Sequence, residues 1–176
     1  MHKTFEKRFI FLGLIQLLLA MVVPFYSPFA VAKEGIAFAH VIGIIQGLLY
    51  FSFAWIWPKL VLPRFSNGLA VVSVHAAFWS NWIGTLLVAI FGSGKSQFIL
   101  NHGIPGYHGF WNVLTLFLLN LSNFIIVAII LAAIGIYGDK MSHKSRRCMD
   151  ICAGIFASCL MVFSVVQTMH PSLSNG

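Results

Sequence analysis

Long apolar runs divide the chain into five segments, separated by short stretches that carry polar residues, glycine or proline. Each run reaches about 20 residues, the length that an α-helix needs to cross the roughly 30 Å hydrocarbon core of a bilayer. The pattern therefore predicts an all-α, polytopic bundle of transmembrane helices. The predicted spans are Phe9–Ala32, Ile36–Trp57, Phe65–Phe91, Trp111–Tyr137 and Cys148–Met169.

The composition agrees with a chain surrounded by lipid. Hydrophobic residues make up 59% of the 176 residues, charged residues only 9%, and the mean hydropathy is +0.90. Soluble domains carry about 25% charged residues, so a water-soluble fold is excluded. Because the sequence shows neither repeats nor linkers, we predict that residues 1–176 form a single integral membrane domain.

The two outer spans carry irregular features. Pro24 and Pro28 interrupt the first span, so we expect a kink or an early end of the helix there. The basic start of the chain and Ala30–Ala32 mimic a signal peptide with a small-residue cleavage site, but the tract between them is long, and we expect a retained helix. The last span contains Asp150 near its start.

Positive charges gather on one side of the predicted bundle. Of eleven Lys and Arg residues, nine lie on the side of the N-terminus, and only Lys33 and Lys95 lie on the other. The positive-inside rule then predicts a cytoplasmic N-terminus, a basic cytoplasmic loop at residues 139–147 and a multi-pass protein of a bacterial inner membrane. The net charge of +7 therefore reflects the orientation of the chain in the membrane, and we expect no binding of nucleic acid.

The second span has the most informative polar face. Glycines there allow either a flat cofactor or another helix to approach the backbone closely. An ionisable side chain inside a bilayer is a functional candidate, and a low dielectric keeps an imidazole neutral, the form that binds metal. A small-residue helix interface with a hydrogen-bonded histidine is the competing interpretation. The residues of this face are His40, Gly43, Gln46, Gly47 and Tyr50.

The other spans offer few ionisable groups. Apart from Asp150 near a boundary, no carboxylate lies within a predicted span, so paired-carboxylate and carboxylate di-iron chemistry are excluded. Any reaction must then rely on a cofactor. Asn81 belongs to a polar stripe of the third span and Asn123 to one of the fourth, and such stripes either join helices or line a pocket.

Further histidines and the cysteines are interpreted more simply. His75, on a face with two tryptophans, is interpreted as a structural histidine. His102 and His108 lie in a glycine-rich loop without a third ligand type, and we interpret them as solvated loop residues. Three cysteines on one face of the last span are predicted to be buried as small apolar side chains, and these are Cys148, Cys152 and Cys159.

The order of several short motifs resembles that of hydroxylaminobenzene mutases and styrene oxide isomerases. The signature is Ala39-His40-x-x-Gly43-x-x-Gln46-Gly47, where these families usually have asparagine at the position of Gln46. The resemblance covers residues 9–138, about three quarters of the chain, as a four-helix core, and leaves the helix at 148–170 as an addition. The other shared motifs are Trp57-Pro58-Lys59-Leu60, Asn81-Trp82, Thr85-Leu86-Leu87, Phe91-Gly92-Ser93-Gly94 and the segment from Trp111 to Gly138.

The resemblance implies a haem-dependent isomerase or mutase. Styrene oxide isomerases are homotrimers that hold ferric haem b between subunits through the signature histidine. His40 would therefore be the metal ligand, with Gly43 and Gly47 beside the cofactor and Gln46 on the substrate side of a neighbouring subunit's haem. The substrate would be a small apolar aromatic epoxide or hydroxylamine, whose oxygen meets the iron as a Lewis acid. Asn81 would orient this substrate, and Tyr50 would donate a proton or pack.

Departures from the family pattern leave two alternatives open. The mutases have glutamate at the positions of Ile42 and Val113, and Thr85 stands where the isomerases have an active-site tyrosine. One alternative is a related haem enzyme that dehydrates or couples another N–O substrate. The other is a non-catalytic b-type haem protein, either an assembly subunit or an electron carrier, and in a carrier His75 or another histidine would have to supply a second axial ligand.

Overall fold

The structure is a computed structural model that describes residues 2–93 and 109–169. Within these ranges all regular structure is helical, and five stretches are long and apolar enough to cross a membrane, which confirms the predicted fold class. The α-helices are α1 (His2–Val22), α2 (Lys33–Ile56), α3 (Arg64–Phe91), α4 (Phe110–Leu121), α5 (Phe124–Ile136) and α6 (His143–Met169).

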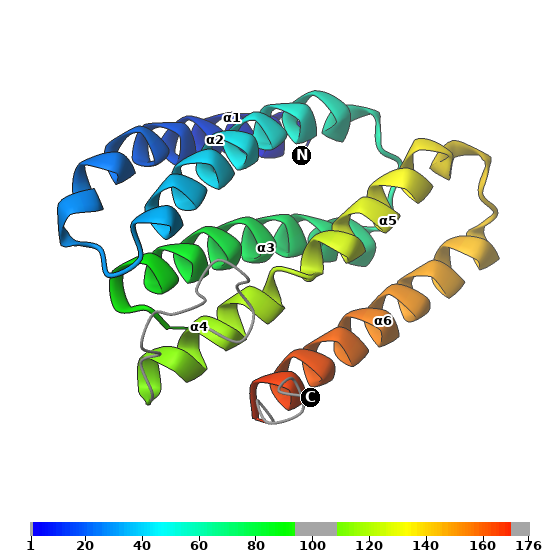
Figure 1. Cartoon of the computed structure of the whole chain (residues 1–176). Helices are drawn as coiled ribbons and strands as arrows, with labels where there is room; N and C mark the ends of the chain where they lie inside the picture. The colour runs from blue at the N-terminus through cyan, green and yellow to red at the C-terminus, as the bar shows by residue number, and fades with distance from the viewer. Residues whose placement is uncertain (1, 94–108, 170–176) are drawn as a thin grey trace.

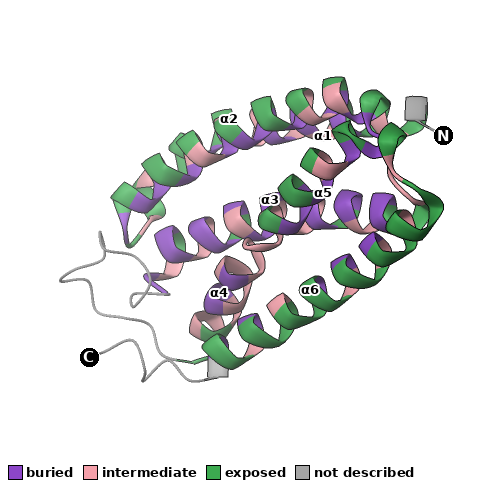
Figure 2. Ribbon diagram, turned by 90° about the vertical axis from the view of Figure 1, so that its right-hand side faces the viewer, coloured by how far each residue is buried: buried purple, intermediate pink, exposed green. Residues whose placement is uncertain are grey.

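The helices are arranged as neighbours in the order of the chain (Figure 1). The hairpin of α1 and α2 packs against α3, which also contacts α4 and α5, and α6 lies outermost against α4, α3 and α5. Burial is concentrated on α3, whereas α2 and α6 keep broad exposed faces (Figure 2). These outer faces carry large apolar side chains such as Leu48 on α2 and Ile151 on α6, which suits a lipid environment.

An aromatic cluster fills the core near the start of α1. Phe9 packs 4.9 Å from the ring of Trp57, and Tyr50 meets the edge of Phe78 with ring centroids 4.9 Å apart. Phe9, Tyr50 and Trp57 are almost completely buried. This cluster fixes the register of α1 and α2 against α3 at the end of the bundle that carries the N-terminus.

The first span ends as its prolines predict. The α-helical part stops at Val22, and the chain continues as a 3₁₀ helix over Val23–Phe29 that contains Pro24 and Pro28. Proline lacks an N–H group and clashes with the preceding turn of an α-helix, so the α-helix cannot continue through these positions.

The fourth predicted span is broken at its middle. It forms α4 and α5, with Ser122 and Asn123 between them. The Ser122 hydroxyl donates to the Leu119 carbonyl across 2.6 Å, and the Asn123 N–H donates to the Asn120 carbonyl at 3.1 Å. These bonds reach back three residues instead of four, so the helix tightens and changes direction here.

Helix α6 is attached to the bundle by a polar contact as well as by packing. The Asp150 carboxylate accepts hydrogen bonds from both the backbone N–H and the hydroxyl of Ser66, in the first turn of α3. The helix buries a face that includes Met149, Ala153 and Ala157.

The prediction that the cysteines of this helix are buried is wrong. Their common face points away from the buried face of α6, so all three side chains are exposed: Cys148, Cys152 and Cys159.

Candidate active site

The imidazole of His40 is held by helix α1. Its Nδ1 atom lies 2.8 Å from the carbonyl oxygen of Ala20, and because a carbonyl only accepts, Nδ1 carries the proton. The lone pair then resides on Nε2, which has no hydrogen-bond partner in the described part of the chain. A histidine fixed in this way by a backbone carbonyl has the tautomer and orientation of a metal ligand.

The two glycines of the signature allow α1 and α3 to approach α2. A Cβ atom at Gly43 would lie 2.7 Å from the Cβ of Ala20 and 2.8 Å from the indole Nε1 of Trp82, and one at Gly47 would lie 2.6 Å from the Cγ of Leu17. Larger residues would therefore push the helices apart. In the structure these glycines serve helix packing, and their contact with a porphyrin stays a prediction.

A cavity of about 280 Å³ lies between α2, α3 and the break that separates α4 from α5. It brings together Gln46 and Asn81, two of the predicted site residues. Its size is at the lower end of the range for small-molecule sites, and its walls are mainly apolar. None of its lining residues is ionisable: they are Ile42, Ile45, Gln46, Leu49, Ala77, Phe78, Asn81, Ser122, Asn123 and Ile125.

Amide groups at this cavity keep unused hydrogen-bonding capacity. The Oε1 atom of Gln46 accepts from Nε2 of Gln16 at 3.0 Å, so its NH₂ group remains free. The side chains of Asn81 and Asn123 have no hydrogen-bond partner among the described residues. These three amides can therefore offer hydrogen bonds to a polar atom placed in the cavity.

Asn123 was not singled out as a site residue by the sequence. Its stripe on the fourth span predicted either a helix contact or a pocket, and only the break at residues 122–123 directs it to the cavity. Ser122 lines the same wall, but its hydroxyl is used by the Leu119 carbonyl. The sequence feature that could have indicated both the break and the cavity residue is the pair of adjacent Ser and Asn residues in the middle of an apolar span.

Tyr50 and Thr85 do not line the cavity. Tyr50 is fully buried in the aromatic cluster, and its hydroxyl and the Nδ1 atom of His75 share a hydrogen bond of 3.1 Å. Thr85 is also fully buried and donates to the backbone carbonyl of Asn81 at 2.8 Å. Tyr50 and His75 therefore stabilise the core in this structure, and the role of Tyr50 as a proton donor stays a prediction.

His40 and the cavity residue Gln46 lie at opposite edges of one face of α2, and both side chains bond to α1. Six residues separate His40 from Gln46, which places them about 120° apart around the helix and about 9 Å apart along it. His40 faces α1 and is not among the residues that line the cavity. In one chain the metal-ligand candidate His40 is therefore offset from the candidate substrate pocket. His102 and His108 lie outside the described residues.

Comparison with known proteins gives one match of high coverage. The family model described as styrene oxide isomerase matches residues 5–138, which include every site residue discussed above and exclude α6. No curated protein and no solved structure matches the chain.

Proposed function

Because the chain belongs to the styrene oxide isomerase family, we propose that it is a membrane-embedded, haem b-dependent isomerase of small aromatic epoxides. Family membership itself implies an isomerase with membrane-spanning helices. The identity of the cofactor, the substrate and the assembly are the parts that we add. Each is supported by a separate feature of the chain.

The observation that carries the proposal is the cavity with its three unpaired amides. Gln46, Asn81 and Asn123 come from three segments and meet at one apolar space of about 280 Å³. Apolar walls suit an aromatic ring, and amide N–H groups suit a single oxygen acceptor such as that of an epoxide. Among molecules that enter from lipid, the cavity would select those with both an aromatic ring and an oxygen acceptor.

The state of His40 fits an axial haem ligand. Protonation at Nδ1 leaves Nε2 free, and the chain needs only one such ligand for a five-coordinate haem. Haem b, when bound through His40, supplies a ferric iron that acts as a Lewis acid toward the substrate oxygen. His75 does not support the alternative of an electron carrier with two axial histidines in one chain, because its ring packs against Phe9. Phe9 lies eleven residues, or about 16 Å, along α1 from Ala20, which holds His40.

His40 is offset from the cavity that holds Gln46 and Asn81, which supports a site shared between subunits. The family resemblance makes this assembly a homotrimer, in which His40 would hold the haem and the cavity of a neighbouring subunit would hold the substrate. The cavity of a neighbouring subunit would bring the amide side chains and the haem site together. The site would then be complete only in the assembly.

The remaining chemistry belongs to the cavity residues. Gln46, Asn81 and Asn123 orient the substrate oxygen by donating hydrogen bonds. As the benzylic C–O bond opens, positive charge develops on carbon, and apolar walls keep out the water that would trap it as a diol. A hydride, which is a hydrogen with its bonding electron pair, then shifts from the oxygen-bearing carbon to the benzylic carbon. The oxygen-bearing carbon becomes a carbonyl, and the product has the same atoms as the substrate.

The residue at position 42 favours an epoxide over a hydroxylamine. Ile42 lines the cavity at a position where the mutases have glutamate. The wall therefore lacks the acid that the mutase reaction would be expected to use. This supports isomerisation of an epoxide rather than the rearrangement of phenylhydroxylamine.

Purified protein with its haem content measured provides the test. We expect styrene oxide to be converted into a product of unchanged mass by the ferric protein, with slower conversion of phenylhydroxylamine. We also expect loss of turnover after anaerobic reduction with dithionite. A diol product from haem-loaded protein, or full turnover in the ferrous state, would contradict the proposed chemistry.

A further inference from the structure

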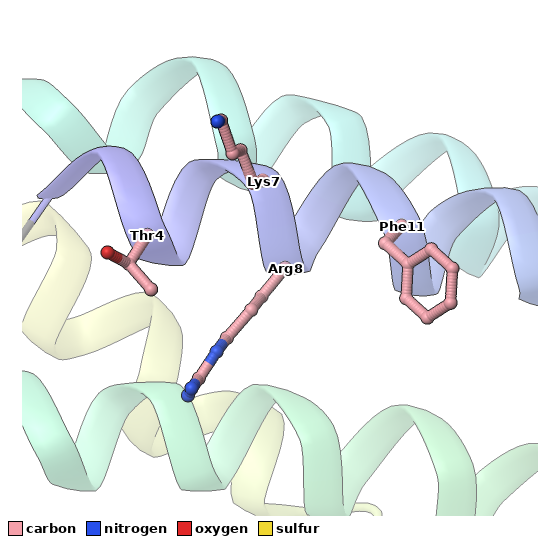
Figure 3. Close-up of a pocket in the computed structure, with 4 residues that line it drawn as sticks. All are labelled: Thr4, Lys7, Arg8 and Phe11. Atoms are coloured by element: carbon pink, nitrogen blue, oxygen red, sulfur yellow. The ribbon is translucent and has the colours of Figure 1, made fainter.

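A second hollow lies on α1, well before the residues that contact His40. It has a volume of about 330 Å³ and is lined by Thr4, Lys7, Arg8 and Phe11 (Figure 3). Their spacing of three, four and seven residues places them along one side of the helix. Figure 3 shows Lys7 and Arg8 extended in opposite directions from α1, where they flank the hollow, and Phe11 further along the same helix.

The two cations of this hollow are not neutralised by the protein. Neither Lys7 nor Arg8 has an ion pair or a hydrogen bond within residues 2–93 and 109–169, and the adjacent Glu6 is half-buried and pairs with neither. Two other cations at this end of the bundle, Lys59 and Arg146, are engaged. Lys59 lies 3.3 Å from the centre of the Trp55 ring, and Arg146 donates to a backbone carbonyl.

The order of residue types along the helix matches a phospholipid. A hydroxyl and two cations come first. Phe11, which is 62% exposed, follows about 10 Å from Thr4 and about 5 Å from the two cations along the helix axis. A guanidinium and an ammonium are the side chains that bind phosphate oxygens. An exposed aromatic ring below them suits the start of an acyl chain, which a free phosphate lacks.

We propose that Thr4, Lys7 and Arg8 bind the phosphate of an anionic phospholipid whose acyl chain lies against Phe11. The site is independent of the cavity at Gln46 and of any haem. It anchors the first turns of α1 at the level of the headgroups, where negative lipids attract cations. The ligand is one bound lipid, in addition to the general attraction of a basic surface for the bilayer.

Native mass spectrometry of the full-length protein tests this site. The protein in detergent is mixed with equal amounts of phosphatidylglycerol and phosphatidylcholine, and the adducts are counted. We expect phosphatidylglycerol to be preferred by about 30-fold, or about fivefold for each cation. The double variant Lys7→Gln/Arg8→Gln should lose this preference, and Lys7→Gln alone should lose about fivefold.

The matched control is Lys140→Gln/Lys144→Gln, which removes the same charge at the same end of the bundle and should keep the preference. If this control loses the preference for phosphatidylglycerol to the same extent, the preference comes from general surface charge, and the proposal is overturned. Displacement of the lipid by inorganic phosphate at equal concentration would identify a free anion as the ligand instead. Loss of subunit association in the double variant, with lipid retained, would identify the hollow as a contact between copies of the chain.

Discussion

Gln16 of α1 donates a hydrogen bond from Nε2 to Oε1 of Gln46 on α2, with the two atoms 3.0 Å apart. Gln16 is completely buried, and its own Oε1 has no hydrogen-bond partner among the described residues. Because the acceptor of the Gln46 amide is already occupied, its NH₂ group is the part left for the cavity. The cavity is thereby set to donate hydrogen bonds, which suits the oxygen of an epoxide.

Replacement of Gln16 by leucine should release this orientation. We expect Gln16→Leu to lower kcat/KM for styrene oxide about tenfold, the cost of one well-made hydrogen bond, while phenylhydroxylamine, which also donates, is affected less. The haem Soret band should be unchanged. Gln167→Leu on the exposed side of α6 is the control. Equal losses for both substrates would show that Gln16 acts through folding and not through the orientation of Gln46.

Removal of the proposed iron ligand has a direct spectroscopic result. In His40→Ala no side chain replaces the free Nε2, so we expect the purified protein to lose its Soret band and its activity. His143→Ala, at an exposed position on α6, should retain both. An unchanged Soret band in His40→Ala would refute the assignment of the ligand.

The amides of the cavity should matter for turnover and not for haem content. Asn81→Leu and Asn123→Leu each remove unpaired polar atoms that we expect to bind the substrate oxygen, so kcat/KM for styrene oxide should fall about 10- to 100-fold in each. Asn120→Leu is a matched control, because it changes a buried asparagine of the same span that does not line the cavity. A loss in Asn120→Leu as large as in Asn123→Leu would point to helix packing as the cause.

The hydrogen bonds between Asp150 and Ser66 should contribute to stability by attaching α6 to α3. Asp150→Ala removes an acceptor of two hydrogen bonds in the first turn of α3, so we expect the free energy of unfolding to fall by about 1–3 kcal/mol. The Soret band should survive, since residues 5–138 hold the candidate site. Unfolding curves of Asp150→Ala, Ser66→Ala and the double variant measure the coupling, and additive losses would show that the two side chains act independently.

The apolar runs predicted the fold well because long hydrophobic helices are the structures that a bilayer accepts. The five spans and the early end of the first helix at Pro24 follow from length and from proline chemistry. Gln46 and Asn81 were predicted as site residues, and the cavity brings them together. Family membership was also predictable, because its motifs keep their order and spacing.

The neighbours of each helix face were not predictable in the same way. Periodicity defines a polar or small-residue face, but it does not say whether a cofactor or another helix covers it, and Gly43 and Gly47 face α1 and Trp82. Because periodicity does not say what covers a face, it also did not predict that Cys152 is exposed or that Tyr50 is buried in the aromatic cluster. The break at residues 122–123 depends on hydrogen bonds that hydropathy does not record.

A span divided at its centre gives the cavity wall two helix ends. The last carbonyls of α4 and the first N–H groups of α5 adjoin Ser122 and Asn123, in the middle of the apolar span. The backbone nevertheless stays hydrogen-bonded across the break, because the Ser122 N–H donates to the Leu118 carbonyl and the N–H groups of Ile125 and Ile126 donate to the carbonyls of Ser122 and Asn123. The span can therefore place two polar residues on the wall of an apolar cavity without exposing peptide groups to lipid, and a membrane helix gains a polar surface that needs no charged side chain.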